Sequence, residues 1–293
     1  MHFLRLWGPL VVGALAAGGC SMAKFGYDVL PTWAHWQVER YLNLDDAQRE
    51  IVGRHLGELH RWHRREQLPE YVEFLREIDD GLRTRIDTAD VTRWRERVGD
   101  AWKPIAERAA PGLAELALTL RPEQIEHLRE RMRKYNEEAR EKLMPDGDGA
   151  REKARAQREL ERAEFALGKL GAAQVREVRT MAAALPPTEE HWFAEREARQ
   201  QRFVELLERL RRERPPKAQA TRLAREYLVS LWQVRDASRR RALEHSTQAR
   251  DEMTAQVLAS ATAAQKKHAS KVVRGYAEDF AALAGIAETA SSR

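Results

Sequence analysis

Three side chains in one stretch of the sequence, His60, His63 and Glu66, are of the types that bind divalent metal ions. They are spaced three residues apart, so on a single helix they would project from neighbouring faces and could grip one ion. Two histidines and a carboxylate without a further ligand motif are weak evidence for a metal site, and a structural role is the preferred interpretation. We therefore predict no bound metal and no cofactor, and keep a metal- or cell-wall-associated enzyme centred on these residues as an alternative.

The same stretch is predicted to form a basic corner between two helices. In the structural interpretation the aromatic residues pack, Pro69 starts the next helix, and the charged residues are solvated. In the functional interpretation the cations face an anionic partner, such as a lipid phosphate or a cell-wall carboxylate. The residues that would form this partner-binding surface are Trp62, His63, Arg64, Arg65, Glu66 and Tyr71.

The sequence carries no nucleophile elbow, phosphate-binding loop, HExxH pair or zinc signature. We therefore predict that the protein is not an enzyme and has no catalytic residues. Its net charge of +5 is the small difference between 51 Lys+Arg and 46 Asp+Glu. These charges are interleaved, as on solvated helix faces, so we predict no nucleic-acid partner.

The first twenty residues predict export from the cytoplasm. Arg5 precedes an apolar run over residues 6–17, which is a secretory-signal pattern and is short for a membrane-spanning helix. Two glycines then precede Cys20, the only cysteine of the chain, so no intrachain disulfide can form. We predict a signal peptide over residues 1–19.

The junction at Cys20 resembles a lipobox, in which a signal peptidase cuts before a cysteine that already carries diacylglycerol. Ala17 stands where leucine is usual. The resemblance implies lipidation of Cys20, a lipidated tether over residues 20–31 and a helical domain over residues 32–293. Ser21 stands where an inner-membrane retention signal would place aspartate, which favours the outer membrane, with the body facing the periplasm.

The remaining chain is predicted to be all-α, an antiparallel arrangement of helical hairpins or a bundle. Alanine, leucine, glutamate and arginine are abundant, and no stretch shows sustained strand alternation. A turn-rich segment near residues 145–150 would divide two sub-bundles. Most of the eight tryptophans should pack between helices, whereas Trp33 and Trp36 are expected at the membrane interface. The predicted helices span residues 33–42, 46–64, 69–85, 89–109, 122–143, 151–170, 172–184, 189–212, 219–234, 236–260 and 263–284.

Four of these helices begin with a related pattern. Gln48, Gln124, Gln174 and Gln265 each follow a helix-capping position by three residues. In a capping box the N-cap side chain accepts from the amide of the third helical residue, whose side chain reaches back to the N-cap amide. The intervals between the glutamines are too irregular for a solenoid. Ordinary capping and a shared ancestry both remain explanations.

The mature chain resembles an uncharacterised family of proteobacterial lipoproteins known only as a domain of unknown function. The resemblance rests on the lipobox, residues 41–45, Gln48 and especially residues 62–71 (WHRREQLPEY), and it implies no activity. More loosely, the glutamine pattern is similar to the LTxxQ pattern of the Spy and CpxP group of all-helical periplasmic chaperones and stress regulators, with only Thr262 at the threonine position. That likeness implies a surface for unfolded or misassembled protein and transfers no specific site.

We predict a noncatalytic outer-membrane lipoprotein whose helices present a protein-binding or chaperone-like surface in the periplasm. Its partners would be the membrane, through the N-terminal lipid, and envelope proteins or unfolded periplasmic clients. A structural tether between the membrane and another envelope complex is a further alternative.

Overall fold

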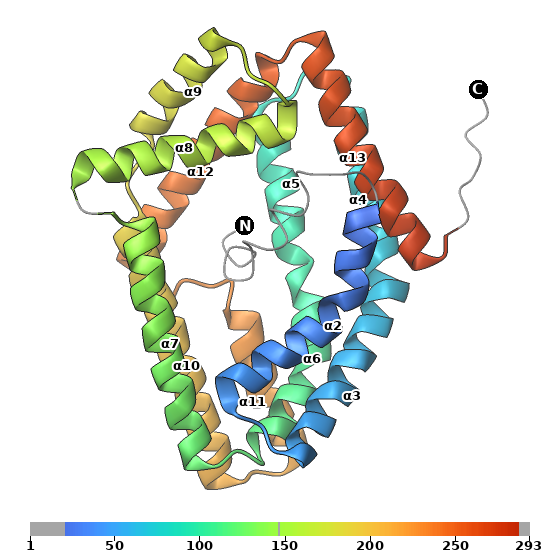
Figure 1. Cartoon of the computed structure of the whole chain (residues 1–293), viewed down its shortest axis with the longest axis vertical. Coiled ribbons are helices and arrows are strands. Elements are labelled where there is room, and N and C mark those ends of the chain that lie inside the picture. The colour runs from blue at the N-terminus through green and yellow to red at the C-terminus, as the bar shows by residue number, and fades with distance from the viewer. Residues whose placement is uncertain (1–20, 146, 287–293) are drawn as a thin grey trace.

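The computed structural model describes residues 21–145 and 147–286, and within these ranges the chain is helical with no β-strand, which confirms the all-α prediction. The helices are arranged as an elongated frame (Figure 1). They are α2 (Ser21–Leu42), α3 (Asp46–Trp62), the π-helical turn His63–Gln67, α4 (Leu68–Leu82), α5 (Thr88–Asp100), α6 (Trp102–Ala117), α7 (Pro122–Leu143), α8 (Asp148–Leu167), α9 (Ala172–Ala184), α10 (Glu189–Glu213), α11 (Lys217–Ser230), α12 (Ala237–Ala259) and α13 (Ala263–Ala284).

Two segments are helical where the sequence predicted something else. The tether expected over residues 20–31 is part of α2, which begins at Ser21 and continues through Pro31. The corner expected after Arg64 is also absent, because α3 passes into α4 through the π-helical turn His63–Gln67. Such a turn adds a residue to a helix and shifts the faces on either side of it without ending the helix. The predicted helix over 89–109 is instead divided at Ala101 into α5 and α6, and α6 continues through Pro111.

Two hydrophobic cores lie at opposite ends of the frame (Figure 1). The first core joins α2, α3, α6, α7, α10 and α11, with Leu120, Ile125 and Leu207 among its buried residues. The second core joins α4, α5, α8, α9, α12 and α13, with Leu167 and Val178 among its buried residues. Each core takes helices from both sides of residues 145–150. The two cores therefore do not correspond to the parts of the chain before and after residues 145–150, because the chain passes from one end of the frame to the other more than once.

The first core is close-packed because two of its helices meet through small side chains. On α6, alanines recur at helical spacing and are completely buried, and α11 presents Ala220 and Ala224 in the same way. Where α6 meets α3, a Cβ atom at Gly112 would lie 2.8 Å from the His55 side chain, so only glycine fits there. Small residues let neighbouring helix axes approach, which increases the number of dispersion contacts. The buried alanines of α6 are Ala106, Ala110, Ala114 and Ala117.

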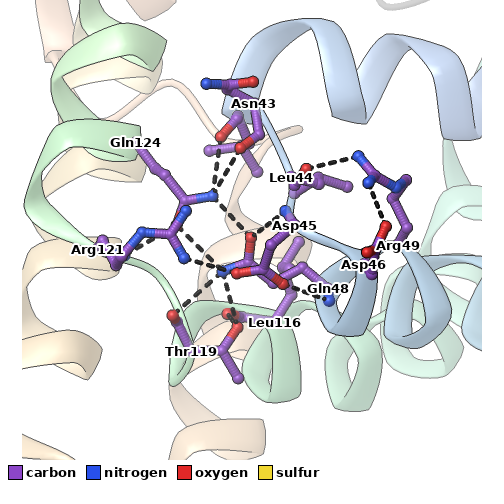
Figure 2. A network of polar contacts seen from close by, with 11 residues as sticks. Asn43, Leu44, Asp45, Asp46, Gln48, Arg49, Leu116, Thr119, Arg121 and Gln124 are labelled. Atoms are coloured by element: carbon purple, nitrogen blue, oxygen red, sulfur yellow. Dashed lines mark hydrogen bonds and ion pairs between the residues drawn. The ribbon is translucent and has the colours of Figure 1, made fainter.

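The four glutamines that mark helix starts form two reciprocal pairs. Gln48 of α3 and Gln124 of α7 exchange amide hydrogen bonds of 3.0 and 2.7 Å in the first core (Figure 2). Gln174 of α9 and Gln265 of α13 exchange two of 2.9 Å in the second. Each pair therefore joins the starts of two helices that are distant in the sequence.

Every glutamine of these pairs has the same further partners. Its Oε1 also accepts from the amide of its own N-cap residue, at 2.9–3.1 Å. Its Nε2 also donates to the carbonyl two residues before the partner helix's N-cap, at 3.0–3.3 Å. Both ends of the frame thus repeat one hydrogen-bonding arrangement with approximate twofold symmetry. The accepting carbonyls belong to Asn43, Thr119, Lys169 and Ser260.

None of the helices over residues 21–145 and 147–286 combines the length and the apolar character needed to cross a bilayer.

Candidate functional site

The candidate metal ligands of the alternative interpretation, His60, His63 and Glu66, are not brought together. Both histidines bind the α2 residue Tyr27: His60 Nε2 donates to its backbone carbonyl at 3.2 Å, and His63 Nδ1 lies 3.0 Å from its hydroxyl. The Glu66 carboxylate instead accepts from Trp62 Nε1 at 2.7 Å and from Arg65 at 3.2 Å. Over the residues that the structure describes, no three His, Cys, Asp or Glu side chains are placed to share a metal ion.

The two histidines and Tyr27 form a neutral cluster at neutral pH. Burial, with a smaller contribution from His60, lowers the pKa of His63 from 6.5 to about 4. Burial also lowers the pKa of His60, and burial raises the pKa of Tyr27 to about 12. The Tyr27 ring lies 4.6 Å from the His60 ring and 5.8 Å from the His63 ring, between centroids. These contacts of Tyr27 hold α2 against the end of α3 and the turn that follows it, which explains why the expected tether is helical.

The predicted partner-binding surface is divided among different environments. Trp62 is buried, with the Arg108 guanidinium 5.5 Å from its ring centroid, and Tyr71 packs on His63 at 5.4 Å between ring centroids. Arg64 donates to the Leu283 carbonyl at the end of α13 at 2.5 Å and lies 3.4 Å from Asp28. Arg65 is exposed. These residues therefore join α2, α4 and α13, and they do not form one cationic face. The predicted lipidation site, Cys20, lies outside the described residues.

A cavity of about 2330 Å³ lies in the middle of the frame. Residues of α2, α3, α5, α6, α7, α10, α11 and α12 line it, and most of its surface is apolar. Five of the eight tryptophans are part of the lining, including Trp33 and Trp36, which the sequence placed at a membrane interface. The aromatic residues of the lining are Tyr27, Trp33, Trp36, Tyr41, Trp102, Tyr135, Trp192, Phe203, Tyr227 and Trp232.

The charged residues of the cavity are mainly arginines, eight of them against five carboxylates. Two of the five carboxylates are neutralised in place. Glu195 is 2% exposed and lies 3.1 Å from both Arg199 and Arg202. Asp251 is 5% exposed and lies 2.8 Å from Arg95. The arginines of the lining outnumber its carboxylates by three, and of these arginines Arg93 and Arg250 pair with carboxylates outside the lining.

Arg196, next to Glu195 on α10, is the clearest example of this excess. It is 7% exposed, and its Nε donates to Asn136 Oδ1 at 2.6 Å. Its guanidinium lies 4.9 Å from the ring centroid of Tyr135 and 5.7 Å from that of Trp192. Within the described ranges, no carboxylate approaches it within the 4.0 Å of an ion pair. Burial lowers the pKa of this arginine, yet a guanidinium remains charged at any physiological pH.

A second arginine of the cavity has a similar environment. Arg40, on α2, lies over Trp36 at 5.2 Å and over Tyr41 at 5.7 Å, from guanidinium carbon to ring centroid. Its Nε is buried, with no hydrogen-bond partner among the residues that the structure describes. In both cases a tryptophan precedes the arginine by four residues, which places the two side chains on one face of a helix.

Sequence reasoning did not find this cavity or its arginines. The one available signal was the W-x-x-x-R spacing, present at Trp36–Arg40 and at Trp192–Arg196. In a chain that is one-third charged, such a spacing does not by itself distinguish a cavity wall from a solvated helix face.

Comparison with known proteins gives a family but no activity. No curated protein and no solved structure matches the chain. A sequence profile described as "Family of unknown function (DUF6279)" matches residues 40–237, which contain the first glutamine pair and both Arg196 and Arg40. Because that match covers more than half of the chain, the protein belongs to the DUF6279 family of unknown function.

Proposed function

We propose that this protein is a lipid-anchored, noncatalytic binding protein of the bacterial envelope whose central cavity holds a segment of unfolded polypeptide. The observation that supports the proposal is the size and lining of the cavity. Pockets for small ligands typically enclose about 300 to 1,000 Å³. A cavity of about 2330 Å³ is larger than such ligands need and suits a segment of chain.

The chemistry of the lining supports a polypeptide occupant. Tryptophan and tyrosine offer large contact areas while losing little conformational entropy, and they tolerate varied apolar side chains. Arginines can bind backbone carbonyls and acidic side chains of a client without requiring a particular sequence. A chaperone-like protein needs this combination, because its clients share exposed apolar side chains and no common motif.

The test is suppression of aggregation by the protein purified from the envelope and held in phospholipid nanodiscs. An equimolar amount should reduce light scattering from a chemically unfolded client. Trp36→Ala should weaken this effect, because Trp36 lines the cavity and is 51% exposed. Phe165→Ala is the matched control, since Phe165 is 47% exposed on α8 and is not part of the lining. Unchanged scattering with the wild-type protein would rule out the chaperone-like function.

The envelope location has a separate test. The signal pattern and Cys20 predict that cells fed labelled palmitate will incorporate it into the wild-type chain. Cys20→Ser should abolish the label, and the labelled protein should fractionate with the outer membrane. Recovery of unlabelled, unprocessed protein from the cytosol would contradict the location.

A further inference from the structure

Arg196 is a buried cation that forms no ion pair with a carboxylate of the described chain. Transferring a guanidinium away from water is unfavourable, and protein interiors usually compensate it with a carboxylate. Glu195, its neighbour on α10, shows that compensation, because Arg199 and Arg202 lie 3.1 Å away and Arg239 lies 3.7 Å away. Among the described residues, the acceptor of a hydrogen bond from the Arg196 side chain is the neutral amide of Asn136. The charge is therefore solvated by a dipole and by two aromatic rings, and it remains available to an anion.

The side chain of Arg196 is held in one orientation. Asn136 Oδ1 accepts from Arg196 Nε at 2.6 Å and from Gln200 Nε2 at 3.1 Å, while Asn136 Nδ2 donates to Gln200 Oε1 at 2.6 Å. The amides of Asn136 and Gln200 therefore fix each other and the guanidinium. Because Nε is occupied, the two terminal nitrogens are the groups left for a ligand. The two terminal nitrogens of a guanidinium can together donate to the two oxygens of one carboxylate.

Arg40 adds a second cation to the same region. It lies on α2, which packs against α7, and α7 also carries Tyr135 and Asn136 and packs against α10. The Tyr41 ring centroid lies 5.7 Å from the Arg40 guanidinium carbon. Tyr135, followed by Tyr41, favours the charged form of Arg196 and so opposes the lowering of its pKa by burial. Within the described residues, Arg40 likewise has no carboxylate within 4.0 Å.

We infer that Arg196, supported by Arg40, forms a carboxylate-binding site in the cavity wall where α2, α7 and α10 meet. This inference rests on the proposed function, because carboxylates are the anions that an unmodified polypeptide offers. The aromatic rings around the two arginines favour a carboxylate carried by, or next to, an apolar or aromatic residue. The source of the carboxylate is either the C-terminus of the client or an acidic side chain, and the chemistry of recognition is the same.

The experiment compares three peptides by quenching of tryptophan fluorescence in the nanodisc-held protein. The first is an apolar peptide that ends in phenylalanine with a free carboxylate. The second is the same peptide as its C-terminal amide, and the third is that amide with one internal glutamate. A charge-assisted bidentate contact predicts about tenfold to a hundredfold tighter binding of a peptide with a carboxylate than of the uncharged amide. Tighter binding of the first peptide identifies the C-terminus of the client as the source of the carboxylate. Tighter binding of the third peptide identifies an acidic side chain.

The variants connect this preference to the arginines. Arg196→Met should remove the preference for the carboxylate while leaving the uncharged amide bound as before, and Arg196→Lys should retain part of it. Arg40→Met should reduce the preference less. Arg240→Met is the matched control, because Arg240 lines the same cavity but is exposed, and it should change nothing.

Two results separate the failure of this inference from that of the proposed function. If all three peptides bind the wild-type protein equally, the carboxylate site is overturned and polypeptide binding stands. The same conclusion follows if the preference persists undiminished in Arg196→Met. If none of the peptides binds, both the proposed function and this inference are overturned.

Discussion

The two glutamine pairs have the same hydrogen bonds and different surroundings. In the first core, Gln48 is 1% exposed and Gln124 is 3% exposed. In the second core, Gln265 is 8% exposed and Gln174 is only partly buried. Water can replace a lost hydrogen bond at a partly exposed amide, but not at a buried one. The comparison teaches that one local pattern can have a large stabilising role at one end of a molecule and a smaller role at the other.

The N-cap residues differ between the two ends as well. In each pair one helix has a full capping box, with Asp45 in the first pair and Thr262 in the second. The other helix has Arg121 or Gly171 at the cap, neither of which can accept a hydrogen bond through its side chain. Only at the first end are the two caps joined directly, by a 2.6 Å ion pair between Arg121 and Asp45.

Replacing a glutamine of the first pair should give the largest effect. Gln48→Ala leaves the Asp45 amide, the Thr119 carbonyl and the Gln124 side chain without their partner in a buried place. We expect the free energy of unfolding to fall by about 3 to 4 kcal/mol. Urea denaturation followed by circular dichroism measures it. Gln201→Ala, on an exposed face of α10, is the control and should change stability by less than about 0.5 kcal/mol.

The corresponding replacements at the second end should be milder. We expect Gln265→Ala to lower the free energy of unfolding by about 2 kcal/mol and Gln174→Ala by about 1 kcal/mol, because water reaches the Gln174 amide. The same denaturation assay applies. A loss at Gln174 equal to that at Gln48 would show that burial does not distinguish the two ends.

The sequence predicted the local part of this arrangement and not its tertiary part. The helix starts at Asp46, Pro122, Ala172 and Ala263 agree with the prediction, because a capping box depends on residues three apart. The association of Gln48 with Gln124, and of Gln174 with Gln265, depends on how distant helices pack. No local spacing specifies which glutamine meets which.

The same distinction explains the errors elsewhere. The segment over residues 22–31 contains Gly26 and Pro31 and has weak helical signals, and its helix is held by contacts of Tyr27 with His60 and His63. Arg196 lies on a helix whose sequence is rich in charge. Its burial results from the packing of distant helices around the cavity, which the local sequence does not specify. The alternative grouping of Glu66 with the two histidines is not found among the described residues, where the nearby indole of Trp62 donates to the Glu66 carboxylate.

The incomplete cap at the second end offers a stabilising change. Gly171 has ordinary extended backbone angles, φ −74° and ψ 158°, and an added Cβ would meet only Gln174 Oε1, at 3.7 Å. Gly171→Ser should therefore supply the missing acceptor and reduce the freedom of the unfolded chain. We expect a gain of about 0.5 to 1 kcal/mol in the free energy of unfolding. Gly171→Ala, which adds no acceptor, should gain less, and an equal gain would show that capping contributes nothing.

The last difference between the two ends is their response to acid. The Gln48 amide, followed by Arg121, lowers the pKa of Asp45 below its ordinary 3.8, whereas Thr262 at the second end does not titrate. A carboxyl whose pKa is lower in the folded state stabilises the fold above the unfolded value of 3.8, and that stabilisation is lost as the pH falls through the folded pKa.

Asp45→Thr gives the first end the cap of the second and keeps an acceptor for the Gln48 amide. Because the variant lacks the titrating group, its stability should be lower than that of the wild type near neutral pH. The difference should narrow as the pH falls below 3.8. Urea denaturation at a series of pH values measures both curves at matched ionic strength, since the Arg121–Asp45 pair is exposed and screened by salt. Parallel curves would mean that neither the Gln48 amide nor Arg121 favours the ionised form of Asp45, and that burial alone distinguishes the two ends.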